Sequence, residues 1–147
     1  MLQQILVALD SSEPSGRALD LGAVMAEKFD ATLQLLHVIR NMQLPPELRK
    51  MAEVEKIAGE RADVLRFVGN RILKDSEGRA KAHGALRVTT ALGDGDPATA
   101  ILDYAKANNS ELIILGTRGL GELKGLMLGS VSRKVSNLSP INVLIVR

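Results

Sequence analysis

Five short apolar segments alternate with longer stretches of helical pattern, and this alternation limits the fold more than any other feature of the 147-residue sequence. The segments are rich in Ile, Val and Leu, which is typical of strands buried on both faces. Strands that alternate with helices predict βαβ units, and hence an α/β fold with a parallel sheet covered by helices on both faces. The predicted strands span residues 3–9, 31–39, 86–92, 112–115 and 142–147.

The stretches between these segments carry apolar residues at helical spacing. Two of them follow residues that start helices: Ser12 or Glu13 precedes the first, and Asp96-Pro97 precedes the third. Pro140 ends the last one. The predicted helices span residues 14–29, part of 41–81, 98–109 and 130–138.

The charged stretch 41–81 leaves the number of its helices open. Gly59 and Gly69 interrupt a helical pattern that fits one long helix or two shorter ones. No internal repeat or linker divides the chain, and domains are typically about 100–150 residues long. We therefore expect a single domain over residues 1–147.

Composition argues against several classes of function. Lysines and arginines are interleaved with acids, the net charge is only +2, and aromatic residues make up 2% of the chain, so no nucleic-acid partner is predicted. The chain has no cysteine, which excludes disulfides and thiolate metal sites. No uncharged apolar run approaches the roughly 18 residues of a membrane span, and the N-terminus lacks a signal-peptide pattern. The expected location is the cytoplasm.

Two predicted strands end in residues that suit a ligand site. The first is followed by Asp10, and the fourth by Gly116-Thr117-Arg118-Gly119. In open parallel sheets, ligands bind beyond the carboxyl ends of strands, where the strand order reverses. If these strands are neighbours, a carboxylate and a glycine-rich loop face one crevice, which is an arrangement that suits a nucleotide.

The glycine-rich loop has two interpretations. Gly119 lets backbone amides approach an anion, Gly129 and Ser130 open a helix whose N-terminus favours phosphate, and Ser132 and Arg118 add donors. Alternatively, the glycines only permit turns, and the leucines of the loop pack it down. No Walker A sequence is present. Spacing alone leaves both interpretations open.

Several other residues are better explained by structure than by chemistry. The segment 93–98 formally fits G-x-G-x-x-A, but its two aspartates repel a pyrophosphate and it follows the third strand instead of the first. His37 is expected in the core, and His83 in a polar loop. Two distant histidines make no zinc signature. Ser11 and Ser12 lack a nucleophile elbow and are expected near a helix cap.

The spacing Gly116-x2-Gly119-x9-Gly129-Ser130 matches G-2x-G-9x-G-S/T, and by this pattern the chain resembles the universal stress protein family. The resemblance covers nearly the whole chain. It includes ILVALDSSEPS near the start, GDPATAILDYAKANNSELIILGTRG, and the ending GSVSRKVSNLSPINVLIVR, where Ser139 stands in place of a common alanine.

The resemblance implies a five-stranded parallel sheet of order 3-2-1-4-5 and an ATP-binding member, because every motif position is kept. It implies Mg²⁺ held mainly through the phosphates. Asp10 then contacts the ribose or the metal–phosphate region, and the Val38 backbone recognises adenine. The residues implied to flank the ribose and phosphates are Gly116, Arg118 and Gly119, and those implied to hold the phosphates are Gly129, Ser130, Val131 and Ser132.

The resemblance also implies a homodimer that forms through the C-terminal strand, and the apolar ending NVLIVR would otherwise be an exposed sheet edge. The expected function is that of a sensor or switch in the stress response. Two alternatives stay open: a slow ATPase or nucleotidyl-transfer enzyme, and a dimeric scaffold that works without a nucleotide.

Overall fold

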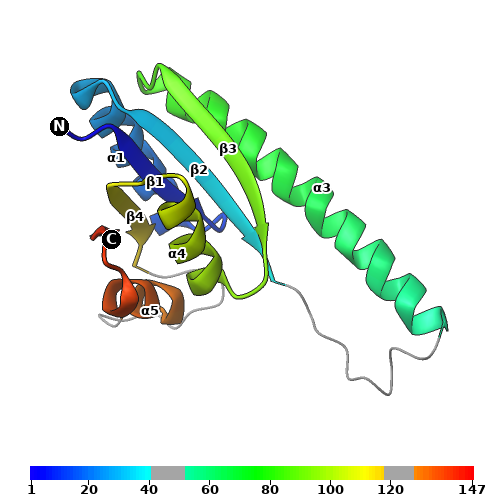
Figure 1. The fold of residues 1–147 in the computed structure, drawn as a ribbon. Coiled ribbons are helices and arrows are strands. Elements are labelled where there is room, and N and C mark those ends of the chain that lie inside the picture. Colours follow the sequence, from blue (N-terminus) through cyan, green and yellow to red (C-terminus); the bar gives the residue numbers. More distant parts are fainter. Residues whose placement is uncertain (41–51, 118–127) are drawn as a thin grey trace.

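The computed structural model describes residues 1–40, 52–117 and 128–147. Over these residues, five parallel strands form one sheet in the order β3-β2-β1-β4-β5 (Figure 1), which confirms the predicted α/β class and strand order. The strands are β1 (Gln4–Leu9), β2 (Thr32–Ile39), β3 (Arg87–Asp94), β4 (Leu112–Gly116) and β5 (Asn142–Val146).

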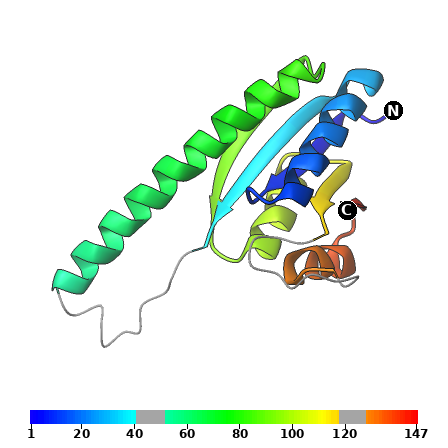
Figure 2. The same cartoon turned by 180° about the vertical axis from the view of Figure 1, so that it is seen from behind.

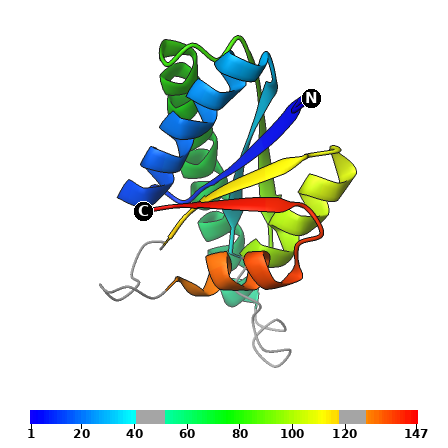
Figure 3. The same cartoon turned by 90° about the vertical axis from the view of Figure 1, so that its left-hand side faces the viewer.

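Helices cover both faces of the sheet, as Figure 3 shows from the β5 side. On one face, α1 packs on β1 and β4 while α3 packs on β2 and β3. On the other face, α4 and α5 pack against each other, with α4 over β2 and α5 beside β5. The helices are α1 (Glu13–Phe29), α3 (Ala52–Ala82), α4 (Pro97–Ala107) and α5 (Ser130–Leu138).

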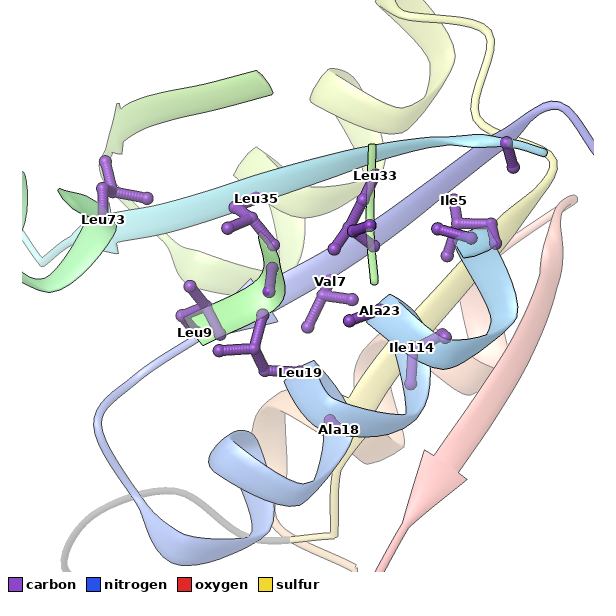
Figure 4. Packing of buried hydrophobic residues seen from close by; sticks show 14 residues of the cluster. Ile5, Val7, Leu9, Ala18, Leu19, Ala23, Leu33, Leu35, Leu73 and Ile114 are labelled. Atoms are coloured by element: carbon purple, nitrogen blue, oxygen red, sulfur yellow. The ribbon is translucent and has the colours of Figure 1, made fainter. Parts of the chain in front are cut away.

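Each face of the sheet has its own aliphatic core. Under α1 and α3, side chains such as Val7, Leu33 and Ile114 are fully buried against the helices (Figure 4). Under α4 and α5, the side chains of Leu6 and Ile113 are likewise fully buried. Neighbouring residues of a strand point to opposite faces, so a strand buried on both sides is apolar throughout. This explains the short apolar runs of the sequence.

The stretch that the sequence left open forms one helix from residue 52 onward; residues 41–51 lie outside the described part. Gly69 is buried where α3 crosses the sheet, and a Cβ there would lie 2.7 Å from Leu92 Cδ1 and 3.1 Å from His37 Cδ2. Close helix–sheet contact therefore favours glycine at this position. A Cβ at Gly59 would have no heavy atom within 4 Å. Neither glycine breaks α3.

The topology places a switch point between β1 and β4. The chain leaves β1 through α1 towards β2, and later returns through α4 to β4 on the other side of β1. The strand order thus reverses between these two neighbours, which pair from Ile5–Leu112 to Val7–Ile114. Ligands of open α/β sheets bind at such a reversal, beyond the carboxyl ends of the strands. No helix of the described residues is long and apolar enough to cross a membrane.

Candidate functional site

Asp10 directly follows β1 and lies in a turn that fixes the Asp10 carboxylate. Its Oδ1 accepts hydrogen bonds from the Ser12 N–H (3.0 Å) and the Ser12 hydroxyl (2.5 Å). Between them, Ser11 has a φ of 69°, in the left-handed region that non-glycine residues seldom adopt. The Asp10 N–H donates to the buried Ser15 hydroxyl at 3.1 Å. These bonds hold the carboxylate at the carboxyl edge of the sheet. Both hydrogen bonds from Ser12 to the carboxylate go to Oδ1.

Gly116 brings the end of β4 into direct contact with the first turn of α1. A Cβ at Gly116 would lie 2.8 Å from three atoms: the Pro14 carbonyl carbon, Pro14 Cβ and the Ser15 nitrogen. Real Cβ atoms essentially never approach other heavy atoms this closely. The glycine is therefore required by packing, whatever the site binds. This contact also fixes the end of β4 relative to the Asp10 turn.

The start of α5 is tied to the end of β4 by three hydrogen bonds. The Gly129 N–H donates to the Thr117 carbonyl oxygen at 2.7 Å. The buried Ser132 hydroxyl lies 3.0 Å from the Thr117 carbonyl oxygen and 3.1 Å from that of Gly116, and donates to this pair. The helix N-terminus consequently lies at the carboxyl end of β4.

The cap of α5 differs from the caps of α1 and α4. Ser12 caps α1 and accepts from the Ser15 N–H at 3.2 Å, while Asp96 caps α4 and accepts from the Thr99 N–H at 3.0 Å. Gly129 caps α5 with no side-chain hydrogen bond. The first N–H groups of an α-helix have no partner within the helix and carry the positive end of its dipole. The α5 start therefore has the electrostatic character of an anion site.

The Val38 backbone faces the place where β1 has ended. The Ile39 carbonyl oxygen accepts from the Gly95 N–H at 2.9 Å, on the β3 side of β2. Successive residues of a strand point their N–H and C=O groups to opposite sides, so those of Val38 point towards β1. The pairing of β1 with β2 ends one residue earlier, at Leu9 and His37. The Val38 peptide thus faces the β1 side beyond the last residue pair of the two strands.

The described residues of the predicted site share one edge of the sheet. Asp10 and Val38 stand at the ends of β1 and β2, and Gly116 ends β4. The fourth component is the α5 start, made of Gly129, Ser130, Val131 and Ser132. Arg118 and Gly119 lie outside the described residues. The arrangement places one carboxylate, one strand-end peptide and one helix N-terminus at the same edge of the sheet.

The G-x-G-x-x-A segment starts a helix, as the sequence analysis predicted. Asp96 is the N-cap of α4, and its Oδ2 also lies 3.0 Å from the Lys134 ammonium of α5. The hydrogen bond from the Thr99 backbone, with smaller contributions from the Thr99 hydroxyl and Lys134, lowers the pKa of Asp96 to about 2. Gly95 has a φ of 104°, which favours glycine. The neighbouring Asp94 pairs with Arg66 at 3.2 Å.

Removing this cap is expected to weaken the fold measurably. Asp96→Ala should lower the free energy of unfolding by about 1 kcal/mol, the usual cost of a lost N-cap. Since the folded-state pKa of Asp96 lies below its ordinary value of 3.8, the capping stabilisation is present above pH 4 and fades as the pH falls through 2. Urea unfolding between pH 2 and 7 measures both effects.

Asp96→Asn is the matched control, because asparagine caps helices about as well as aspartate and does not titrate in this range. It should keep most of the stability at pH 7 and flatten the acid dependence. An Asp96→Ala chain that unfolds at the wild-type urea concentration would show that the cap contributes nothing.

The histidines take structural positions. His37 is half-buried, and its Nδ1 donates to the Leu9 carbonyl oxygen at 2.8 Å, so it is satisfied beneath α3 as expected. His83 lies in the turn after α3, with Nε2 3.2 Å from Asp20 Oδ1. Over residues 1–40, 52–117 and 128–147, no group of three or more His, Asp or Glu side chains gathers in a way that suits a metal ion.

Residues 1–147 match the description "Universal stress protein family" over their full length. The chain belongs to this family. It is 38% identical to the universal stress protein YxiE of Bacillus subtilis over 149 aligned positions, which cover both chains completely. These findings confirm the family that the glycine spacing predicted.

Solved structures of universal stress proteins support the fold. UspA from Lactobacillus plantarum superimposes with a TM-score of 0.87 at 24% identity, covering 99% of this chain and 97% of its own, and shows the same fold. A universal stress protein solved in complex with cAMP superimposes with a TM-score of 0.73 at 27% identity, covering 99% and 97% of the two chains.

Sequence reasoning overlooked the residue that positions Asp10. Ser15 is buried, and its hydroxyl accepts the Asp10 N–H while its own N–H donates to the Ser12 side chain. The run DSSEPS contains the signal, because a serine three residues after an N-cap falls at N3 of the helix. In this universal stress protein, the Asp10 turn and the α1 cap therefore form one hydrogen-bonded unit.

Proposed function

We propose that this universal stress protein binds ATP, together with Mg²⁺, in the crevice at the ends of β1 and β4, and acts as a sensor or switch in the stress response. The observation that carries the proposal is the glycine-capped start of α5, held 2.7 Å from the Thr117 carbonyl oxygen at the end of β4. An anion-favouring helix end at the same edge of the sheet as the Asp10 turn supports a phosphate site there.

The phosphates are assigned to the α5 start. Gly129 has no side chain to stand between an anion and the first-turn amides, and Ser130 and Val131 follow it at the first helical positions. The Ser132 hydroxyl already donates to strand-end carbonyls, so its main-chain N–H is the group assigned to a phosphate. The proposal extends to Arg118 and Gly119, which complete the ATP-binding glycine spacing in the sequence.

The nucleoside is assigned to the ends of β1 and β2. The Val38 peptide points towards the β1 side, where it can pair with the edge of an adenine ring. The Asp10 carboxylate is placed to accept from ribose hydroxyls or from water on a phosphate-bound Mg²⁺. A universal stress protein of similar fold was solved in complex with cAMP, which supports the assignment of an adenine nucleotide to this site.

Calorimetric titration with ATP, ADP and AMP, each with and without Mg²⁺, tests the proposal. We expect affinity to fall in the order ATP, ADP, AMP, and Mg²⁺ to strengthen ATP binding most. Equal affinities for ATP and AMP would overturn the assignment of the phosphates. If no adenine nucleotide binds or raises the melting temperature, the scaffold alternative is favoured. Multiple-turnover phosphate release that Asp10→Ala abolishes without loss of binding would favour the enzyme alternative.

The proposal includes a homodimer formed through β5. Among the described strands, β5 lies at the sheet edge next to β4, and its residues Val143 to Val146 are only half-buried. Apolar Leu21 and Val24 of α1 and Leu138 of α5 are exposed. An apolar edge strand is a template for pairing with a second copy.

Replacing Ile145 with lysine tests this edge. Ile145→Lys is expected to halve the mass measured by light scattering at micromolar concentration, because it places a charge within the paired strands. Leu86→Lys, at an exposed residue before β3, is the matched control and should keep the wild-type mass. A wild-type chain that is monomeric under these conditions would contradict the dimer.

A further inference from the structure

Helix α3 continues well past the sheet that it covers. The Arg66 guanidinium lies 3.2 Å from Asp94 Oδ2, and Asp94 is the last residue of β3, so this ion pair marks the level at which the strand ends. Residues 52–65 lie beyond it, about 21 Å of helix at 1.5 Å per residue. Figures 1 and 2 show this part of α3 projecting from the body of the molecule.

The projecting part and the residues that follow it carry large apolar side chains in solvent. Ile57 is 64% exposed, Val64 61%, Phe67 75% and Val68 46%. Positions 57, 64 and 67 or 68 follow the seven- and three- or four-residue spacing of a single helix flank. The face that packs on the sheet uses other positions, among them the buried Gly69. We call residues 57, 64, 67 and 68 the α3 stripe.

Charged residues on the same flank are arranged so that the stripe complements a reversed copy of itself. Glu60 lies on the N-terminal side of its centre and Arg71 on the C-terminal side, both exposed. In an antiparallel pair of α3 helices in which Val64 faces Phe67 of the second copy, Glu60 faces Arg71 of that copy. Ile57 then faces the methylene chain of Lys74. A parallel pair would instead place Glu60 against Glu60, which is unfavourable.

We propose that the α3 stripe is a contact surface for a second copy of this chain, with the two α3 helices antiparallel and centred between Val64 and Phe67. The contact runs from residue 57 to residue 74, about 27 Å of each helix. It lies on a different part of the molecule from the β5 edge. A chain with two separate two-fold surfaces assembles beyond a dimer.

Cysteine pairs test the register directly, because the chain has no cysteine of its own. Val64→Cys and Phe67→Cys chains are prepared separately, mixed, and treated with a short bis-maleimide crosslinker. We expect the mixture to give several times more crosslinked dimer than Val64→Cys mixed with Gly59→Cys, since Gly59 is exposed on another side of α3. Equal crosslinking in the two mixtures overturns the proposal.

Charge exchange provides an independent readout of the same contact. Glu60→Arg and Arg71→Glu should each weaken the association by about fivefold, from the usual strength of two symmetry-related exposed ion pairs. The double variant restores opposite charges and should recover most of the loss, as measured by sedimentation equilibrium. A double variant that associates no better than the single ones overturns the proposed register.

Phe67→Glu distinguishes a second copy from other occupants. It should weaken association by at least about tenfold, since it places a carboxylate in the centre of the contact. Gly59→Glu adds the same charge on another side of α3 and should leave the mass unchanged. If Phe67→Glu lowers the melting temperature of the chain without changing its mass, another part of the same chain covers the stripe and the proposal is wrong.

Discussion

Gly116→Ala is expected to lower the free energy of unfolding by about 2–3 kcal/mol, the upper part of the range for inserting atoms into a packed interior. The added Cβ would lie 2.8 Å from Pro14 backbone and ring atoms and from the Ser15 nitrogen. None of these is the end of a flexible side chain, so relief requires moving the first turn of α1 away from β4. Urea unfolding at pH 7 measures the loss.

Gly59→Ala is the matched control for this substitution. Gly59 lies in the interior of α3 with no heavy atom within 4 Å of an added Cβ, so alanine should raise stability by about 0.5–1 kcal/mol through helix propensity. A Gly116→Ala chain as stable as the wild type would show that the β4–α1 contact is looser than described. Because this position is under packing constraint, any loss of nucleotide binding by Gly116 variants has to be compared with their loss of stability.

Gly129→Val is expected to weaken ATP binding by at least about 100-fold while leaving the fold largely intact. The residue has φ −63° and ψ 163°, an extended conformation that valine adopts readily, so little backbone strain is introduced. The branched side chain stands at the helix start and keeps a phosphate from the first-turn amides. Losing two hydrogen bonds to a charged group, at about 1.5–3 kcal/mol each, corresponds to this loss of affinity.

Calorimetry with Mg²⁺-ATP and urea unfolding together measure the two parts of this prediction. Gly59→Val introduces the same side chain on the exposed part of α3 and should bind ATP as the wild type does. Gly129→Val and wild-type chains with equal ATP affinity would refute the assignment of the phosphates to the α5 start.

The order of the elements was predictable from the sequence because strands buried on both faces are apolar throughout and helices follow recognisable start residues. Element ends were less predictable. Strand β3 continues to Asp94, beyond the predicted end at residue 92, because Ile39 of β2 pairs with it there. The single helix α3 was one of two open alternatives. In the sequence, Gly69 argued against one continuous helix. The structure explains this glycine by packing, because a Cβ at position 69 would lie too close to Leu92 and His37 in two strands of the sheet.

The candidate site was predictable where the signal is local, and less so where partners are distant in sequence. The glycine spacing identified the family and made Gly129 a candidate site residue, while Asp10 was a candidate because it follows the first strand. It gave no sign that Gly116 packs against the first turn of α1, a hundred residues earlier, or that the Ser132 hydroxyl bonds strand-end carbonyls. Both facts depend on β1 and β4 being neighbours. From the sequence, the pairing of β1 with β4 could be predicted only through the family resemblance.

In the proposed complex, ATP phosphates contact the backbone at the start of α5, at the same sheet edge as the Asp10 turn. Amide resonances of ¹⁵N-labelled chain, titrated with Mg²⁺-ATP and separately with AMP, test it most directly. We expect the N–H signals of residues 129–132 to move with ATP much more than with AMP, and those of Val38 and its neighbours to respond to both. Saturating ATP that leaves residues 129–132 unmoved and shifts amides elsewhere would contradict the proposal.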